Sequence, residues 1–341
     1  MYTIKDKYLS TNFICEYIWI GGKGELRSKT RVLKNINIEH IPEWNYDASS
    51  TDQALSDGNT EGMLVPVVYY INPLRKTKGY TDLLVLCETY DVNGIPFATN
   101  HRCNAKQIFD SKLDESPWYG LEQEYFIYIN RKSEYNLDTS RHYCGLSGNV
   151  IERQIVEKHL SACLESGLTI SGINAEVTKS QWEFQVGPCE GIKAGDELIV
   201  ARYLLEKIAE EFDATICFDP KPSANENGSG CHTNFSTKTM RGENGIEEIY
   251  SAIDKLNKTH NEHIKVYGKD NELRLTGHHE TSSYTIFSWG KGTRNTSIRI
   301  PNQVVKDGCG YFEDRRPASN IDPYLVTSAI FNTCCISPNN L

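Results

Sequence analysis

The sequence predicts an α+β protein in which a small, strand-rich N-terminal domain precedes a larger domain of mixed helices and strands. Three observations lead to this fold class. The first hundred residues hold aromatic and β-branched runs separated by turn residues. Later segments carry apolar residues at helical spacing, with short strand-like runs between them. The length of 341 residues and a hydrophobic fraction of 39% suit one large domain or two ordinary ones.

Four strands are expected in the N-terminal domain. Residues 13–20 end at the glycine-rich turn 21–24 and are followed by residues 27–33, which predicts a hairpin. Residues 64–70 and 83–90 are two further β-branched and aromatic runs. The N-terminal domain therefore reads as a small sheet.

A turn-rich stretch at residues 91–96 precedes a change of pattern, so we place the first domain at 1–98 and the second at 99–341. The second domain alternates amphipathic helices with short strands. Its helices are expected at residues 103–113, 150–166, 196–212 and 246–267, and its clearest strand at residues 121–129.

Composition limits the function classes that are possible. The formal net charge of −9 argues against nucleic acid as the main partner, because phosphate backbones need basic patches. The N-terminus lacks the apolar core of a signal peptide, and no stretch reaches the roughly 20 apolar residues of a membrane span. The 11 cysteines show no paired zinc-binding spacing, which indicates reduced thiols in the cytosol.

Glutamates on strand-like segments are the first candidates for chemistry. Glu122 and Glu124 project from one face of the predicted strand 121–129, because the strand period is two. Glu176 lies in a second polar segment, and Glu183 points away from the apolar face of its neighbours. Considered one at a time, each glutamate is better explained by a solvent-exposed sheet face.

Polar stretches nearer the C-terminus add further candidates. Residues 227–236 contain a Gly-Ser-Gly turn, with His232 and Asn234 on one strand face, although a lone histidine is more often structural. Residues 274–282 form a polar loop, and the run 313–316 places carboxylates beside two arginines. Surface ion pairing is the ordinary explanation of such a run.

Taken together, the candidates indicate phosphoryl transfer. Five glutamates and one histidine form an oxygen-rich ligand set that suits Mg²⁺ or Mn²⁺ better than zinc. Arginines bind phosphate and carboxylate groups in a bidentate manner, and metals plus arginines around a nucleotide are typical of phosphoryl transfer. The glycine-rich turn 21–24 is not a phosphate loop, because it lacks the Gly-Lys-Ser/Thr ending.

The same segments, in the same order, resemble the type II glutamine synthetase family. The motifs are EQEY at 122–125, NAEV at 174–177, WEFQ at 182–185, FDPKP at 218–222, CHTNFS at 231–236, HETS at 279–282 and EDRRP at 313–317, with YIWI at 17–20 and EWNYD at 43–47. The resemblance covers residues 13 to 335 approximately. It implies a small N-terminal β-grasp domain, a larger glutamine synthetase catalytic α/β domain, and a cytoplasmic homodecamer of two stacked pentameric rings whose active sites lie between neighbouring subunits.

Carried over motif by motif, the resemblance implies a role for each candidate. The metal nearer glutamate would be held by Glu124, Glu176 and Glu183, and the metal that bridges the ATP phosphates by Glu122, His232 and Glu313. Glutamate would contact Asn227, Gly228, Arg274 and Arg315, the phosphates Arg294 and Arg299, and the nucleotide Asn234 and Ser236. The flap would carry Glu280, and the adjacent subunit would supply Asp47 and Ser50 for ammonium. The implied cofactors are two or three Mg²⁺ or Mn²⁺ ions per site.

The implied reaction has two steps. The γ-carboxylate of glutamate first attacks the γ-phosphate of ATP, while metals and arginines offset the charge, and γ-glutamyl phosphate forms. Ammonium then loses a proton to Asp47, and ammonia attacks the acyl carbon. Glu280 excludes water and takes a proton from the adduct, which leaves glutamine, ADP and phosphate.

A few positions depart from the family pattern. Ala48 stands where the family has a glycine, so a positive φ at this position would cost energy. Residues 151–154 replace Tyr-Gly-Arg-Asp, Glu226 replaces a tryptophan, and His278 replaces an aromatic residue. Because the implied metal ligands and main arginines are intact, we interpret these changes as tuning.

Two alternatives remain open. A related ligase would couple glutamate to an amine other than ammonia, and the altered residues near Ala48 and Ile151 are where that difference would appear. A non-catalytic homologue should have lost metal or flap residues, whereas this chain keeps Glu280 and all six implied metal ligands.

Overall fold

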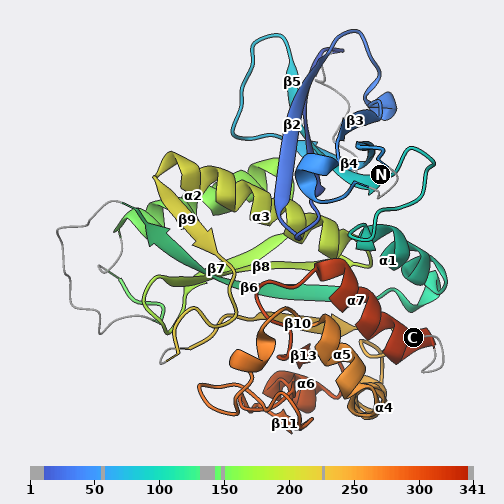
Figure 1. The fold of residues 1–341 in the computed structure, drawn as a ribbon. Coiled ribbons are helices and arrows are strands. Elements are labelled where there is room, and N and C mark those ends of the chain that lie inside the picture. Colours follow the sequence, from blue (N-terminus) through green and yellow to red (C-terminus); the bar gives the residue numbers. More distant parts are fainter. Residues whose placement is uncertain (1–10, 55–57, 131–142, 147–149, 225–226, 337–341) are drawn as a thin grey trace. The chain divides into compact units, whose positions relative to one another are not determined.

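The computed structural model describes residues 11–54, 58–130, 143–146, 150–224 and 227–336. The chain divides into two compact units, one made of Met1–Asn104 and Ser161–Leu168 and the other of Ala105–Leu160 and Thr169–Leu341. Each unit contains its own sheet, and helices accompany the sheet of the second (Figure 1). No helix in the described part of the chain is long and apolar enough to cross a membrane.

The N-terminal unit is built on a five-stranded sheet in the order β2-β1-β5-β4-β3. The predicted hairpin is present as β1 (Phe13–Ile20) and β2 (Leu26–Leu33), which pair antiparallel. The two later predicted strands are β4 (Glu61–Ile71) and β5 (Thr81–Tyr90), and β5 pairs parallel with β1. The short edge strand β3 (Trp44–Asp47) was not predicted, and it carries Asp47.

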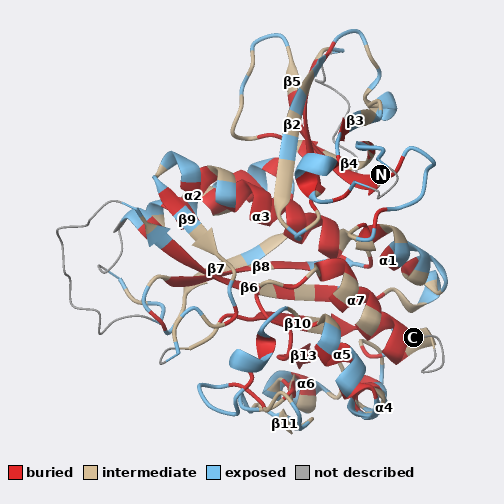
Figure 2. Ribbon diagram, viewed as in Figure 1, coloured by how far each residue is buried: buried red, intermediate tan, exposed pale blue. Residues whose placement is uncertain are grey.

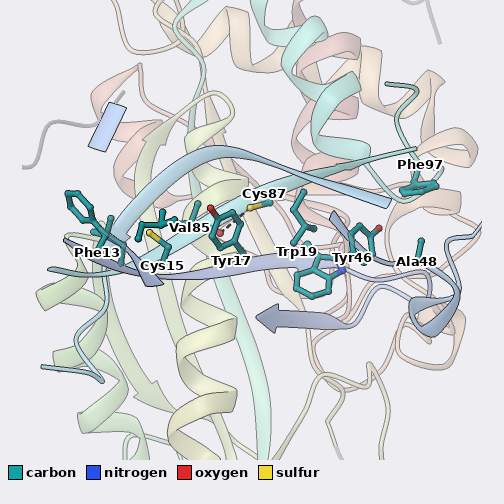
Figure 3. Close-up of a cluster of buried hydrophobic side chains, with 12 residues drawn as sticks. Phe13, Cys15, Tyr17, Trp19, Tyr46, Ala48, Val85, Cys87 and Phe97 are labelled. Carbon is teal, nitrogen blue, oxygen red and sulfur yellow. Dashed lines mark hydrogen bonds between the residues drawn. The ribbon is translucent and has the colours of Figure 1, made fainter. Parts of the chain in front are cut away.

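Alternate side chains of β1 create the core of this sheet. Phe13, Cys15, Tyr17 and Trp19 share one face, because side chains alternate along a strand, and none is more than 5% exposed. Figure 3 shows them packed with side chains from the neighbouring strands and loop: Val85, Cys87, Tyr46, Ala48 and Phe97. Fully burying one large apolar side chain is worth about 1.5–3 kcal/mol. The core therefore fixes β3 and the loop that follows it.

The second unit contains an eight-stranded sheet in the order β11-β12-β13-β10-β6-β8-β7, with β9 paired to β6. The strands are β6 (Trp118–Ile129), β7 (Ile170–Ala175), β8 (Gln181–Glu190), β9 (Ala214–Cys217), β10 (Cys231–Ser236), β11 (Trp289–Lys291), β12 (Ile298–Ile300) and β13 (Phe312–Asp314). Figure 2 shows the central strands of this sheet buried over most of their length. Such burial requires helices on the sheet, and α3 packs against β6, β8 and β9.

The helices are α1 (His101–Asp110), α2 (Val150–Ser166), α3 (Lys193–Glu211), α4 (Gly245–Lys258), α5 (His260–Val266), α6 (Asn302–Asp307) and α7 (Pro323–Phe331). Helices α1, α2 and α3 lie where helices were predicted, whereas α6 and α7 were not predicted. The single helix predicted at residues 246–267 is wrong, because α4 and α5 are separated at Thr259. The Thr259 hydroxyl donates to the Lys255 carbonyl at 3.1 Å, a local bond of the kind that competes with a regular helix.

Candidate active site

Neighbouring strands bring the predicted carboxylates to one face of the sheet. On β6, Glu122 and Glu124 point to the same side. In the sheet register Glu124 lies opposite Glu183 of β8, and Glu122 lies opposite His232 of β10. Strand β7 pairs with the other edge of β8 and ends one residue before Glu176. Strand pairing therefore gathers residues that are far apart in the sequence.

These side chains converge into two groups with metal-ligand spacing. The first group is Glu122, His232 and Glu313, and the second group is Glu124, Glu176 and Glu183. Within each group the potential ligand atoms all lie within 4.8 Å of one another. The two groups coincide with the two triplets that the family resemblance implies. Carboxylate oxygens with a single imidazole suit Mg²⁺ and Mn²⁺, so the residues present fit two divalent cations.

The electrostatics of the second group also favour a cation. Burial raises the pKa of Glu124 to about 8, and the nearby Glu176 adds to the effect. Burial raises the pKa of Glu183 to about 9, with Glu122 and Glu124 as further causes. Burial also raises the pKa of Glu176. Like charges this close together cannot all ionise unless something neutralises them, and a divalent cation would do so.

His232 faces the first group as a neutral ring. Burial lowers the pKa of His232 well below its usual range, and Arg315 contributes further. Its Nδ1 atom lies 3.4 Å from Glu122 Oε2 and 3.7 Å from Glu313 Oε1. On the other side of the ring, Arg274 Nη2 lies 3.0 Å from Nε2. Because arginine can only donate, Nε2 accepts from Arg274 and the proton of the neutral ring lies on Nδ1, beside the two carboxylates. Nδ1 would release this proton when it binds a metal.

We expect metal binding to strengthen as the pH rises from about 6 to about 9, because protons on Glu124 and Glu183 must leave when a cation binds. Their raised pKa values mean that the metal-free folded protein holds more protons than the unfolded chain in this window, so its stability falls as the pH rises. Added Mg²⁺ or Mn²⁺ should therefore raise the melting temperature more at high than at low pH. Thermal unfolding at several pH values, with and without metal, measures this shift in melting temperature. A shift that does not depend on pH would contradict the assignment.

Arginines line the same polar cavity, of about 260 Å³, as residues of the first and second groups. Glu313 is paired with Arg299 at 3.0 Å and with Arg315 at 2.5 Å, so two cations lie beside the first group. Arg274 is buried, and it donates to the carbonyl oxygens of Arg315 at 3.0 Å and Arg316 at 3.1 Å. Burial lowers the pKa of Arg274 to about 10, so it still carries its charge at neutral pH. The cavity is therefore equipped to bind anions.

The loop that carries Glu280 has an uncommon backbone conformation. His279 and Glu280 have φ values of +51° and +61°, in the left-handed region that residues other than glycine rarely adopt. The exposed Glu280 carboxylate lies 3.7 Å from Arg294 Nη1. The Glu280 carbonyl accepts a hydrogen bond from Arg315 at 3.4 Å. The loop thus contacts two arginines of the cavity.

Most of the predicted site residues in the second unit line this cavity. They are Glu122, Glu124, Glu176, Glu183, Asn227, Gly228, His232, Arg274, Glu280, Arg294, Arg299 and Arg315. Glu313 is not among these lining residues, but it belongs to the first group, together with Glu122 and His232. Asn234 and Ser236 are outside the lining, where Asn234 donates to Glu122 at 2.8 Å and the Ser236 hydroxyl accepts from Arg241 at 2.9 Å.

Asp47 and Ser50 lie in the N-terminal unit, at the end of β3 and in the turn after it. The Asp47 carboxylate accepts hydrogen bonds from the Ser49 N–H at 3.0 Å and from the Ser50 hydroxyl at 2.6 Å. The hydrogen bond from the Ser49 side chain is the largest cause that lowers the pKa of Asp47, followed by that from Ser50. Asp47 is therefore an ionised, exposed carboxylate at neutral pH.

The structure describes most, but not all, of the residues that depart from the family pattern. Ala48 has φ −69°, an ordinary right-handed value, so the energetic cost of a positive φ does not arise. Ile151 is an exposed residue of α2, and His278 is exposed beside the loop of Glu280. Glu226 lies outside the described residues.

Several polar residues that line the cavity were missed by sequence reasoning. They are Tyr143, Asn174, Gln181, Gln185, His279 and Thr281. Asn174 and Gln185 stand two residues from Glu176 and Glu183, and the strand period would have placed Gln185 beside Glu183. Tyr143 carries no such signal, because it lies in none of the helices or strands that the sequence predicts.

Comparison with known proteins identifies the family. The family described as "Glutamine synthetase, catalytic domain" matches residues 107–264. The chain is 51% identical to the glutamine synthetase of Candida glabrata, over 97% of this chain and 92% of that protein. It is 50% identical to the glutamine synthetase of Saccharomyces cerevisiae, over 99% of this chain and 94% of that protein. The chain belongs to the eukaryotic-type glutamine synthetase family.

Two further comparisons concern another sequence relative and a solved structure of a glutamine synthetase. A putative glutamine synthetase of Acanthamoeba polyphaga mimivirus is 53% identical over 95% of this chain and 94% of that protein. A Plasmodium falciparum glutamine synthetase solved by cryo-EM matches with a TM-score of 0.78, covering 97% of this chain and 73% of that chain at 18% identity. At this identity the match shows the fold alone. The match confirms the α+β class that the sequence of this chain predicts.

Proposed function

We propose that this protein joins ammonia to the γ-carboxylate of L-glutamate at the expense of ATP, giving L-glutamine, ADP and phosphate through γ-glutamyl phosphate. The observation that supports this function most is the cavity in which two carboxylate-rich groups adjoin four arginines. One polar cavity with both features can hold an anionic amino acid next to a metal-bound polyphosphate. The glutamine synthetase relatives make the same reaction the expected one.

Mg²⁺ or Mn²⁺ is the proposed cofactor, with two or three ions per site. Glu124, Glu176 and Glu183 would hold the ion nearer glutamate, and Glu122, His232 and Glu313 the ion at the ATP phosphates. When bound, these ions would neutralise phosphate charge and orient the reacting oxygens. The raised pKa values of Glu124 and Glu183 support the first assignment, because a cation at this position would relieve their repulsion.

The arginines would bind the anionic substrates. Arg274, fixed by backbone carbonyls, would receive a carboxylate of glutamate together with Asn227, Gly228 and Arg315. A Cβ at Gly228 would lie 2.4 Å from the Pro220 carbonyl oxygen and 2.8 Å from Arg274 Cγ, so only glycine fits beside this arginine. Arg294 and Arg299 would face the transferred phosphate, and Asn234 and Ser236 the nucleotide.

Ammonium would be bound and deprotonated by the N-terminal unit of a neighbouring subunit. Asp47, whose carboxylate is ionised and oriented by two serines, would accept the proton, and Ser50 would contact ammonium. Glu280 would close over the acyl phosphate and exclude water. This arrangement requires an oligomer, and we propose a cytoplasmic homodecamer of two pentameric rings. We also propose that residues 1–98 are a β-grasp domain and residues 99–341 the catalytic domain.

Amine competition tests this function. We expect the purified protein to form glutamine from glutamate, ATP and ammonium, and to form γ-glutamyl hydroxamate when hydroxylamine replaces ammonium. Because the proposed ammonium site is a single small carboxylate site, methylamine should compete weakly with ammonium. A clear preference for methylamine would favour a ligase for another amine. Absence of every product, with metal and ATP present, would indicate a non-catalytic homologue.

A further inference from the structure

Two side-chain amides lie between Glu183 and Glu176, two carboxylates of the second group. Gln185 Nε2 donates to Glu183 Oε1, and it also donates to Asn174 Oδ1 at 2.8 Å. Asn174 Nδ2 then donates to Glu176 Oε1 at 2.8 Å. The two amides therefore connect Glu183 and Glu176 by a continuous chain of hydrogen bonds.

The direction of this chain is fixed by its own members. The Asn174 oxygen is occupied by the Gln185 N–H, so the Asn174 nitrogen must face Glu176, which as a carboxylate can only accept. Each amide engages one oxygen of its carboxylate, and the second oxygen of Glu176 accepts from the Val177 N–H at 3.3 Å. Both glutamates are thus held in one orientation before a metal arrives.

A glycine on the neighbouring strand makes room for this arrangement. Gly172 of β7 pairs with Gln185 of β8, and Asn174 pairs with Glu183 two residues further along. A Cβ at position 172 would lie 2.3 Å from Gln185 Oε1. Gly172 is not among the glycines with positive φ, so its backbone does not require glycine. The position of the Gln185 amide therefore explains why a glycine stands at residue 172.

We propose that Asn174 and Gln185 are positioning residues that orient Glu176 and Glu183 for the metal nearer glutamate. The inference rests on the proposed function for the existence of that metal. Without the amide chain each of the two carboxylates would lose an orienting hydrogen bond, and its orientation would have to be fixed at the moment of metal binding. Groups that orient metal ligands in this way typically change metal affinity by roughly 10- to 100-fold when removed.

Gln181 is a related amide that we keep out of the test. Its Nε2 lies 3.3 Å from Glu124 Oε2, but it also donates to the Gly228 carbonyl at 3.0 Å and the Ser229 hydroxyl at 3.2 Å. Removing Gln181 would therefore disturb the proposed glutamate-binding loop as well as the metal group.

Mn²⁺ binding to the full-length, nucleotide-free protein tests the inference, with free Mn²⁺ measured by electron paramagnetic resonance. We expect Gln185→Ala and Asn174→Ala each to weaken Mn²⁺ binding at one site by roughly 10- to 100-fold. The double variant should lose less than the product of the two single losses, because both residues belong to one chain of hydrogen bonds. Circular dichroism and melting temperature verify that each variant is folded.

Gly172→Ala provides a variant that removes no carboxylate and no amide group. Its new methyl group should displace the flexible Gln185 side chain and weaken Mn²⁺ binding in the wild-type background. In the Gln185→Ala background the same substitution should have no further effect. An equal loss in both backgrounds would mean that Gly172 acts through the strand, and unchanged Mn²⁺ affinity in the amide variants would overturn the positioning role. If the wild-type protein bound no Mn²⁺, the metal site of the proposed function would fail instead.

Discussion

Replacing Arg316 by alanine is expected to lower the free energy of unfolding by about 3–5 kcal/mol, because it leaves a buried carboxylate without its partner. The side chains of Arg316 and Asp314 are both 0% exposed, with Nη2 and Oδ2 at 2.7 Å. The Tyr267 hydroxyl also donates to Asp314 at 2.8 Å, and Arg316 Nη1 lies 3.0 Å from His260 Nδ1. This network anchors β13, the strand that carries Glu313.

Urea-induced unfolding of the full-length protein measures this effect. A matched control is Lys158→Ala, which breaks an exposed pair with Glu211 and should cost less than about 1 kcal/mol. A double variant with alanine at both Asp314 and Arg316 should be less destabilised than the sum of the single variants, since no charge remains buried alone. If Arg316→Ala were no more destabilising than Lys158→Ala, the buried pair would not be the anchor that we describe.

Asp47→Ala and Arg315→Ala homo-oligomers are each expected to be nearly inactive, whereas an equal mixture should recover about a quarter of wild-type activity. Asp47 lies in the N-terminal unit and Arg315 in the catalytic unit. In the proposed ring, each site takes Asp47 from one subunit and Arg315 from its neighbour, in a head-to-tail contact. With random assembly, about one interface in four pairs the two intact residues.

The measurement is glutamine formation after the two variants are dissociated, mixed and reassembled. Subunit exchange is verified by mass spectrometry of tagged chains, and each variant mixed with itself is the control. Recovery assumes that the sites act independently. A mixture that stays as inactive as its parents despite proven exchange would mean that each site is built within one chain, and the role of Asp47 would have to be withdrawn.

The strands that carry the proposed metal ligands were predictable because strand periodicity is local. Glu122 and Glu124 had to share a face once residues 121–129 formed a strand, and β6 bears this out. The convergence of Glu183 and His232 beside them depends on which strands pair and in which register. Their spacing along the sequence contains no such information, so only the resemblance to a known family divided the six residues into the two triplets that the structure brings together.

Prediction stopped where structure depends on tertiary contacts. Strand β3 has four residues and was missed, because so short a segment has no clear periodicity before it pairs with β4. The break at Thr259 was missed because the apolar spacing continues across it. The amides Asn174 and Gln185 were visible within the motifs, but their hydrogen bonds to the glutamates follow from the antiparallel register of β7 and β8.

Oxygen transfer from glutamate to phosphate tests the proposed reaction most directly. Glutamate labelled with ¹⁸O in its γ-carboxylate would be incubated with the protein, ATP, ammonium and Mg²⁺, and the released phosphate examined by ³¹P NMR. A γ-carboxylate oxygen attacks the γ-phosphate and releases ADP, and ammonia then attacks the acyl carbon, so the bond from this carbon to that oxygen breaks and phosphate leaves. We therefore expect each phosphate to carry one glutamate oxygen and to accompany one molecule of glutamine. Glutamine formed together with phosphate that contains no glutamate oxygen would contradict the γ-glutamyl phosphate intermediate and with it the proposed function of the cavity.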